Sequence, residues 1–331
     1  MDSLESLIRR DPGQRGLLAA LGDIHPLGHL RGAAESLVER DGPVAIVTGF
    51  AIPLPHGPVA ETDGPPGAVM LADVLRRLGR SVTLVTDIPC RSAVAAAAEI
   101  AGLSDVPVEA CPVDGRDGEA WCEAFVRGHR DLAHLVSIER VGPAHTAETA
   151  DSNAPGTLTR YLESTPEPQR GRCCNMRGEI IDDITAPLHR LFEQFSASPH
   201  GPTTIGIGDG GNELGMGRLP WDLLLRHGGS ATSPLCRVAT DWLIVAGVSN
   251  WGGMALAAAM ALRGGHPELA TVWTEDRQRA LLEMLAARGP AVDGATRIAA
   301  ASVDGLSDSV YFGVWREVQA WLAGSSRRVP G

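Results

Sequence analysis

Short apolar runs alternate with longer amphipathic stretches along most of this 331-residue chain. The apolar runs are rich in β-branched residues and predict strands at 44–48, 81–86, 106–111, 132–138, 203–207 and 242–248. Apolar positions at helical spacing predict helices at 65–78, 91–101, 119–130, 184–195 and 251–262. This alternation is typical of a doubly wound α/β fold, Rossmann-like in layout, in which a mostly parallel sheet carries helices on both faces.

The chain divides at its first predicted strand. Residues 1–42 predict two helices, at 4–21 and 30–40, which we expect to pack on the core or to serve a homodimer. Residues 43–331 are predicted to form a single α/β catalytic domain. Within that domain, residues 142–172 are rich in Pro, Thr, Glu and Ala with little periodicity. We interpret them as an insertion that forms a lid or is disordered.

Composition narrows the possible functions. Hydrophobic residues make up 44% of the chain and charged residues 21%, as in ordinary globular proteins, and no apolar run is long enough to span a membrane. The net charge is −11 and no run of arginines exceeds two, so we expect neither nucleic acid nor a membrane as partner. All 29 basic residues are arginine, which excludes a Schiff-base, pyridoxal phosphate or P-loop lysine. Six cysteines without metal-ligand spacing, and an N-terminus without a signal-like segment, predict a cytoplasmic protein.

The most informative segment is glycine-rich and covers residues 206–217, directly after a predicted strand. Glycine lets a ligand approach the main chain, and a helix that begins at Asn212 would turn its N–H groups toward that ligand. The glycine spacing formally matches a dinucleotide fingerprint, but Asp209 would place negative charge where the pyrophosphate belongs. A purely structural glycine turn is the other interpretation. We therefore expect a small-molecule site without a nicotinamide or flavin.

Polar residues follow several of the predicted strands at the point where each strand ends. Because the carboxyl ends of parallel strands share one edge of the sheet, these residues should converge on one cleft. They are Thr48, Asp87, Glu139, Arg140, Asp209, Ser249, Asn250 and Trp251. A magnesium ion could be gathered by the oxygens of Asp63, Asp87, Asp209 and Glu213, although no fixed-spacing motif supports a metal. We predict a site without a cofactor and keep magnesium as an alternative.

Five motifs along the chain resemble those of the D-glutamate cyclase family. They are ETDGPPG at 61–67, ER at 139–140, NMRG at 175–178, DGGNE at 209–213 and VSNWGG at 248–253. The likeness runs from about residue 43 to residue 262, with fainter echoes at 293–294 and 303–306. The resemblance implies a hydro-lyase that removes water from D-glutamate to give 5-oxo-D-proline, without a redox cofactor.

This ring closure requires a base that frees the amine, a donor that stabilises the oxyanion and an acid that helps hydroxide leave. Two carboxyl groups in a glycine-lined site can be the base and the acid if their surroundings separate their pKa values. We predict this pair to be Asp209 with Glu213, or Glu61 with Asp63. The predicted substrate-binding residues are Thr48, His56, Arg140, Asn175, Arg177, Gly210, Gly211, Asn212, Ser249, Asn250 and Trp251.

For several of these residues a structural role is the alternative. Arg140 and Arg177 suit bidentate binding of a substrate carboxylate, but buried arginines also form ion pairs with acids such as Glu139. Trp251 is predicted either to wall the pocket or to pack in the core. His56, on a loop, is a candidate acid or base, or a bystander.

Two features depart from the family pattern. The family usually has a tyrosine pair before the NMRG motif, where this chain has Cys173 and Cys174, and its stretch between residues 140 and 175 is usually shorter. We expect both departures to enlarge the cleft and make it more apolar. They favour, as an alternative, a relative that dehydrates and cyclises a larger intermediate in secondary-metabolite biosynthesis. A non-catalytic protein that binds small acids is the third hypothesis.

Overall fold

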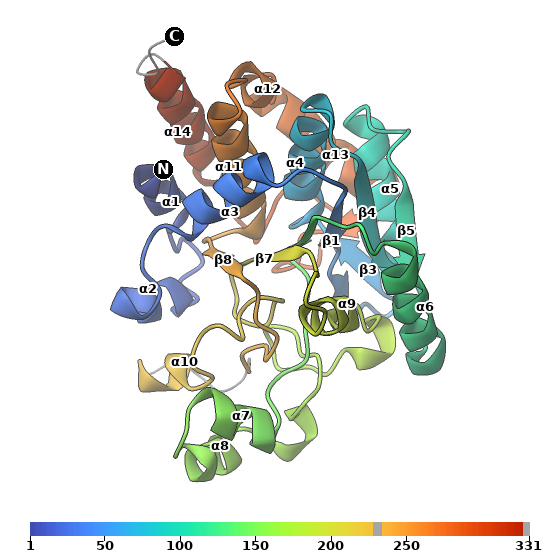
Figure 1. Ribbon diagram of the computed structural model, residues 1–331, viewed down its shortest axis with the longest axis vertical. Coiled ribbons are helices and arrows are strands. Elements are labelled where there is room, and N and C mark those ends of the chain that lie inside the picture. The colour runs from blue at the N-terminus through green and yellow to red at the C-terminus, as the bar shows by residue number, and fades with distance from the viewer. Residues whose placement is uncertain (228–233, 327–331) are drawn as a thin grey trace.

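The computed structural model describes residues 1–227 and 234–326 and is built around one six-stranded parallel sheet (Figure 1). Its strands are β1 (Val44–Thr48), β4 (Val82–Asp87), β5 (Val108–Cys111), β6 (His134–Ile138), β7 (Thr203–Gly208) and β8 (Trp242–Val245). They lie in the order β5-β4-β1-β6-β7-β8, which confirms the predicted doubly wound α/β fold. The winding reverses between β1 and β6, and folds of this kind bind their ligands at that point.

Alternate residues of each strand enter two separate cores, one on each face of the sheet. Ile46 and Val136 belong to the larger core, whereas their neighbours Val47 and Leu135 belong to the smaller one. The larger core is covered by α1 (Asp2–Ile8), α3 (His29–Glu39), α4 (Pro65–Arg77), α5 (Arg91–Ile100), α11 (Ser249–Arg263), α12 (Glu268–Thr271), α13 (Glu275–Arg288) and α14 (Asp308–Ser326). The smaller core is covered by α2 (Leu17–Leu21), α6 (Gly115–Gly128), α9 (His189–Ser196) and α10 (Leu223–Arg226). Short 3₁₀ helices in the connections are η1 (Gly22–Ile24), η2 (Ile88–Cys90), η3 (Glu167–Gln169) and η4 (Asp182–Ile184).

Helices α4 and α11 approach each other closely near their first turns. A Cβ atom at Gly253 would lie 3.0 Å from the main chain of Gly67, and one at Gly67 would lie 3.1 Å from the main chain of Asn250. Glycine is therefore required at both positions if the two backbones are to keep this spacing. The close approach fixes the segments just before the two helices relative to each other.

A small second sheet escaped prediction from the sequence. Its strands β2 (Ala51–Ile52) and β3 (Val59–Glu61) pair antiparallel, and β9 (Ala291–Val292) pairs parallel with β3. Strands of two or three residues are too short for an alternating pattern to reveal them. Because β3 ends at Glu61 and β9 leads into Asp293, this sheet carries a late segment of the chain to a predicted catalytic residue.

The prediction of one helix over residues 4–21 is wrong. A turn separates α1 from α2, because Pro12 and Gly13 interrupt the helix. The carboxylate of Asp11 closes this turn by accepting hydrogen bonds from the N–H groups of Arg15 and Gly16, at 2.9 and 2.8 Å. Helix α1 packs against α11 and α14, so the turn is held at the edge of the main domain.

Residues 142–172 contain two short helices, α7 (Ala147–Asn153) and α8 (Leu158–Ser164). The ring of Tyr161 packs edge-on against that of Trp221, with their centroids 5.0 Å apart. The indole N–H of Trp221 also donates to the Thr157 hydroxyl at 2.9 Å. The predicted insertion is therefore a helical pair packed beside α10.

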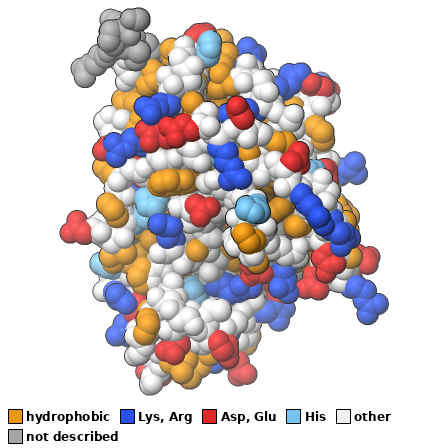
Figure 2. Space-filling view, in the orientation of Figure 1, with side chains coloured by type: hydrophobic (Ala, Val, Ile, Leu, Met, Phe, Trp, Pro, Cys, Tyr) orange, Lys and Arg blue, Asp and Glu red, His pale blue; other side chains and the backbone are white. Residues whose placement is uncertain are grey.

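No helix in the described part of the chain is both long and apolar enough to cross a membrane. Figure 2 shows arginine and acidic side chains interspersed with apolar ones over the face in view. The expectations of a cytoplasmic location, of a homodimer and of no nucleic-acid or membrane partner stay predictions.

Candidate active site

The ends of β1, β6 and β7 open onto a cavity of about 280 Å³. Its inner end carries four carboxyl groups and one guanidinium group, those of Glu61, Glu139, Asp209, Asp304 and Arg15. Its apolar wall includes Phe50, Ile52 and Met176. Its outer rim is formed by Asn175, Arg177, Gly294, Ala295 and Arg297. The cavity thus lies at the point where the sheet reverses its winding, and it receives residues from both ends of the chain.

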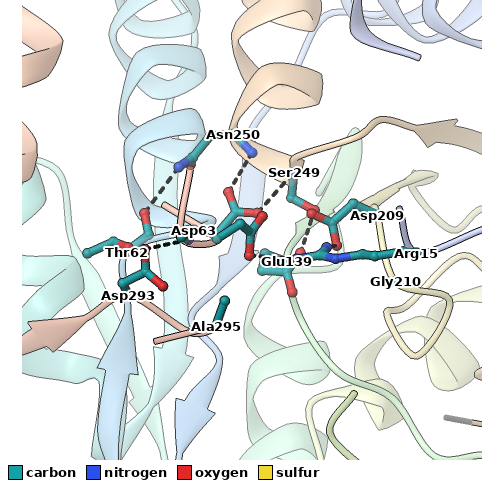
Figure 3. A network of polar contacts seen from close by, with 12 residues as sticks. Arg15, Thr62, Asp63, Glu139, Asp209, Gly210, Ser249, Asn250, Asp293 and Ala295 are labelled. Carbon is teal, nitrogen blue, oxygen red and sulfur yellow. Dashed lines mark hydrogen bonds and ion pairs between the residues drawn. The ribbon is translucent and has the colours of Figure 1, made fainter. Parts of the chain in front are cut away.

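Asp63 and Asn250 join the first turns of α4 and α11 (Figure 3). The Asp63 carboxylate, just before α4, accepts hydrogen bonds from the N–H groups of Ser249 and Asn250 at 2.9 and 2.7 Å. The side-chain oxygen of Asn250 in turn accepts from the N–H groups of Gly64 and Gly67, at 2.9 and 3.0 Å. Each residue therefore caps the helix of the other. Neither is among the described residues that line the cavity, so both serve the scaffold directly behind it.

Glu139 lies among the buried acids, directly after β6. Its φ angle is +48°, in the left-handed region that side chains rarely adopt, and the Ser249 hydroxyl donates to its Oε2 at 2.5 Å. Burial raises the pKa of Glu139 well above its usual value, and the charges of Asp209 and Glu213 raise it further. These surroundings favour the protonated form of Glu139, which can act as an acid. The sequence placed Glu139 at the cleft and as a possible ion-pair partner of Arg140, but not among the catalytic residues.

Glu61 lies beside Glu139 at the inner end of the cavity. A Cβ atom at Gly294 would lie 1.9 Å from Glu61 Oε2, so the carboxyl group occupies space that any side chain at that position would need. Burial raises the pKa of Glu61 well above its usual value, with further contributions from Asp304 and Asp63. Burial and Asp304 also raise the pKa of Asp63, to about 7. Burial and mutual repulsion therefore favour the protonated forms of these neighbouring acids.

Glu213 turns back onto its own loop. Its carboxylate accepts hydrogen bonds from the N–H groups of Gly210 and Gly211, both at 2.7 Å. These N–H groups were expected to face a ligand, but Glu213 already binds them. The expectation of a helix that begins at Asn212 is also wrong, because Gly215 has a φ of +110° and the adjoining residues form isolated bridges.

Asp209 lines the cavity and pairs with Arg15 from the turn between α1 and α2. One terminal nitrogen of the Arg15 guanidinium contacts Asp209 Oδ1, and the other lies 2.6 Å from Asp304 Oδ1. The second oxygen of each acid is buried and, within the described residues, has no hydrogen-bond partner. Burial raises the pKa of Asp209 well above its usual value, and Arg15 is the strongest influence that lowers it. Asp209 thus presents a buried oxygen without a partner beside a guanidinium group, an arrangement that suits a general base.

Sequence reasoning missed both Arg15 and Asp304. Asp304 has a φ of +56° and lies in a turn that Asp293 closes, by accepting from the N–H group of Gly305 at 2.7 Å. Residues 293–294 and 303–306, which show the fainter family likeness, flank this turn, and they could have pointed to Asp304. Arg15 carries no such signal, because only the tertiary packing of the N-terminal segment brings it to the cavity.

Arg140 is buried beneath the cavity rather than in it. It donates to Asp87 at 2.6 Å, and to the carbonyl oxygens of Gly49 and Ala186, both at 2.8 Å. This is the structural ion pair that the sequence left as the alternative, with Asp87 in place of Glu139 as the partner. It ties the ends of β4 and β6 together.

Arg177 and Arg297 bring two guanidinium groups to the outer rim. Arg177 is exposed and donates to the carbonyl oxygen of Ala295 at 2.9 Å. Arg297 donates to Glu179 at 2.6 Å, and Glu179 also accepts from the side-chain amide of Asn175 at 2.6 Å. Arg297, which the sequence did not single out, therefore lies in the position expected for Arg140.

The remaining predicted binding residues do not line the described cavity. Thr48 is buried behind it, and the side-chain amide of Asn212 donates to a main-chain carbonyl group. Trp251 packs in the larger core and donates to the carbonyl oxygen of Tyr311 at 3.1 Å, which is the core alternative. His56 is exposed in the turn between β2 and β3.

The two departures from the family pattern lie away from the cavity wall. Cys173 and Cys174 are buried, and Cys173 packs with Phe50 and Ile181. Neither cysteine, nor any residue of 142–172, is among the described residues that line the cavity. The expectation that these departures enlarge the cleft therefore stays a prediction.

Two groups of carboxylates have oxygens within 4.8 Å of one another: Asp63 with Asp209 and Asp304, and Glu139 with Asp209 and Glu213. Asp87, from the predicted magnesium set, pairs with Arg140 instead. The Arg15 guanidinium already lies against two acids of the first group, and main-chain N–H groups bind Glu213. We therefore assign no metal ligand here, and a site without a cofactor stays a prediction.

Comparison with known proteins places the chain in a family. A family model described as "D-glutamate cyclase-like, C-terminal" matches residues 4–156 and 158–318. The human protein "D-glutamate cyclase, mitochondrial" is 35% identical over 265 residues, which cover 78% of this chain and 38% of the human one. The chain thus spans well under half the length of this relative. With this extent of similarity, the chain belongs to the D-glutamate cyclase-like family.

Proposed function

We propose that this protein is a dehydrating cyclase that closes D-glutamate, or a closely related amino acid, into a lactam such as 5-oxo-D-proline. The observation that carries the proposal is the polarity of the cavity, with buried acids at its inner end and two guanidinium groups at its rim. A dicarboxylic amino acid offers the complementary charges, an ammonium group and two carboxylates. Support for D-glutamate itself comes from the name of the human relative.

In this proposal Asp209 is the base and Glu139 is the acid. The substrate ammonium group lies against the unpartnered oxygens of Asp209 and Asp304, and its side-chain carboxyl group lies beside Glu139. Arg177 and Arg297 at the rim bind the other carboxylate, because guanidinium groups match carboxylate geometry. Bound this way, the amine nitrogen and the carboxyl carbon that it attacks both lie over the acid cluster.

The proton balance requires one carboxyl group that accepts and one that donates. Asp209 takes a proton from the ammonium group, and the freed nitrogen attacks the side-chain carboxyl carbon to form the C–N bond. Glu139 gives its proton to the oxygen whose C–O bond breaks. Glu139 then regains a proton from the nitrogen, and Asp209 passes the proton it took to the same departing oxygen. In total the nitrogen loses two protons and the oxygen gains two, so water leaves and both carboxyl groups return to their starting states. The raised pKa of Glu139 suits it to donate at neutral pH.

Proton NMR of the purified protein with D-glutamate, L-glutamate and 5-oxo-D-proline in separate samples tests the proposal. We expect interconversion within the D series only. Asp209→Asn should abolish it, while His56→Ala, an exposed change away from the cavity, should not. Absence of conversion by the wild-type protein, or full activity of Asp209→Asn, would overturn the assignment.

A larger and more apolar substrate is the second candidate function, as in secondary-metabolite biosynthesis. The observation in its favour is the apolar wall that Phe50, Ile52 and Met176 form beside the acids. N-alkylated or chain-extended glutamate analogues, supplied in the same NMR assay, distinguish the two candidates by their relative kcat/KM. A non-catalytic acid binder would instead bind D-glutamate in calorimetry and convert none of the compounds.

A further inference from the structure

Arg15 reaches the acid cluster from a turn that two sets of contacts hold firmly. Asp11 binds the N–H groups of Arg15 and Gly16, and the N–H group of Gly247, before α11, donates to the carbonyl oxygen of Ile8 at 2.8 Å. A Cβ atom at Gly247 would lie 1.5 Å from a carbonyl oxygen of this segment, so the two backbones touch. The position of the Arg15 side chain is therefore built into the fold.

Arg15 is the cation that faces the inner end of the described cavity. Its two terminal nitrogens divide between Asp209 and Asp304, and its side chain is 19% exposed. Among the described residues, the other charged groups that act most strongly on Asp209 are acids: Asp304 from the C-terminal turn, Asp63 from before α4, Glu139 from after β6 and Glu213 from its own loop. Without Arg15, each of these acids would disfavour a negative charge on Asp209.

We propose that Arg15 is a positioning residue that keeps the Asp209 carboxylate oriented and free to take the substrate's proton. This inference rests on the proposed function, in which Asp209 is the base. A guanidinium group that contacts only Oδ1 leaves Oδ2 for the substrate ammonium group. Arg15 thereby separates the roles of two neighbouring carboxyl groups, since within the described residues its ion pairs are with Asp209 and Asp304 and not with Glu139.

The alternative is that Arg15 only anchors the N-terminal turn. Four variants separate these explanations. Arg15→Gln removes the charge, Arg15→Lys keeps it, and Arg10→Gln makes the same change on the same segment, at an exposed residue that pairs with Glu317. Asp304→Asn removes a negative charge from the surroundings of Asp209. It should therefore shift the pKa of Asp209 in the opposite direction to Arg15→Gln.

The first measurement is the pH dependence of kcat/KM for D-glutamate. In Arg15→Gln we expect the rising limb to move to higher pH by at least about one unit, because loss of an adjacent positive charge raises the pKa of a carboxyl group. Arg15→Lys should restore most of the wild-type profile, Arg10→Gln should match the wild type, and Asp304→Asn should move the limb to lower pH. Equal profiles for the wild type and Arg15→Gln would overturn the inference.

The second measurement does not depend on turnover. Protein labelled with ¹³C at the aspartate carboxyl carbons is titrated by NMR, and the Asp209 signal is assigned by its loss in Asp209→Asn. The titration midpoint should rise in Arg15→Gln and fall in Asp304→Asn. If the wild-type protein converts no substrate, the proposed function fails, and these midpoints still decide the role of Arg15. If Arg15→Gln does not fold, a midpoint unchanged in Asp304→Asn would overturn the inference.

Discussion

The capped junction of α4 and α11 and the acid cluster beside it use the same residue types for opposite purposes. At the junction, Asp63 and Asn250 are surrounded by main-chain N–H groups that bind their oxygens. In the cavity, Asp209 and Asp304 each keep one buried oxygen without a partner among the described residues. Carboxylates whose oxygens are fully bonded hold the structure, whereas those left with a free oxygen can bind or react. Whether the side-chain oxygens have hydrogen-bond partners therefore distinguishes the structural residues from the reactive ones, which the sequence motifs do not.

The largest effect should come from Asp209→Asn. The variant keeps the shape of the side chain but cannot accept the substrate's proton, so kcat should fall by roughly two to four orders of magnitude. Thermal unfolding should change less than in Asn250→Ala, because the Arg15 guanidinium keeps Asp304 as a partner and the capped junction is untouched. A drop in the melting temperature that parallels the lost activity would erase the distinction between the two regions.

Asn250→Ala should show the reverse pattern. It removes two acceptor contacts and one donor contact and leaves the N–H groups of Gly64 and Gly67 without their partner. We expect the free energy of unfolding to fall by about 2 kcal/mol, as for other lost caps and buried hydrogen bonds. Urea denaturation measures this loss. A variant as stable as the wild type would show that the two helix starts do not depend on the reciprocal caps.

Arg177→Gln tests the rim. Because Arg177 is exposed and is proposed to bind a carboxylate, its loss should raise KM for D-glutamate about tenfold and leave kcat nearly unchanged, a cost of about 1.4 kcal/mol. Steady-state kinetics provide the measurement, with the exposed Arg10→Gln as a matched control. A fall in kcat at constant KM would instead assign Arg177 to the chemical step.

Glu139→Gln should make the protein slightly more stable as it loses activity. Glu139 has a raised pKa when folded, so the folded state binds its proton more tightly than the unfolded state does. Its contribution to stability is full below the unfolded pKa and declines as pH rises toward the folded one. Glutamine mimics the protonated form, so the variant should be more stable than the wild type at pH 8 and equally stable at pH 4. Thermal unfolding at the two pH values is the check, and an equal change at both would contradict the assignment.

The sequence was sufficient to predict those features that depend on residues close together in the chain or on the general geometry of a parallel sheet. Buried parallel strands give continuous apolar runs, and strand ends in such a sheet must share an edge, so Glu139 and Asp209 could be expected near each other. Local pattern could not decide whether Glu213 faces a ligand or its own loop, because both choices satisfy a glycine-rich turn. The contribution of Arg15 depends on how Pro12 breaks a helix and how the resulting turn docks, which is a tertiary outcome.

The contact of Arg15 with Asp209 and Asp304 has a consequence for how the chain reaches its native state. Arg15 and Asp304 lie near opposite ends of the sequence, so loop closure over almost the whole chain must precede their meeting. During synthesis, the sheet and every family motif up to residue 253 emerge before the turn that carries Asp304. A fragment that begins at the first strand would contain all five motifs, yet its clustered acids would lack their buried counter-charge. Such a fragment would also lack α1 and α3, which cover part of the larger core, and should be an incomplete catalyst.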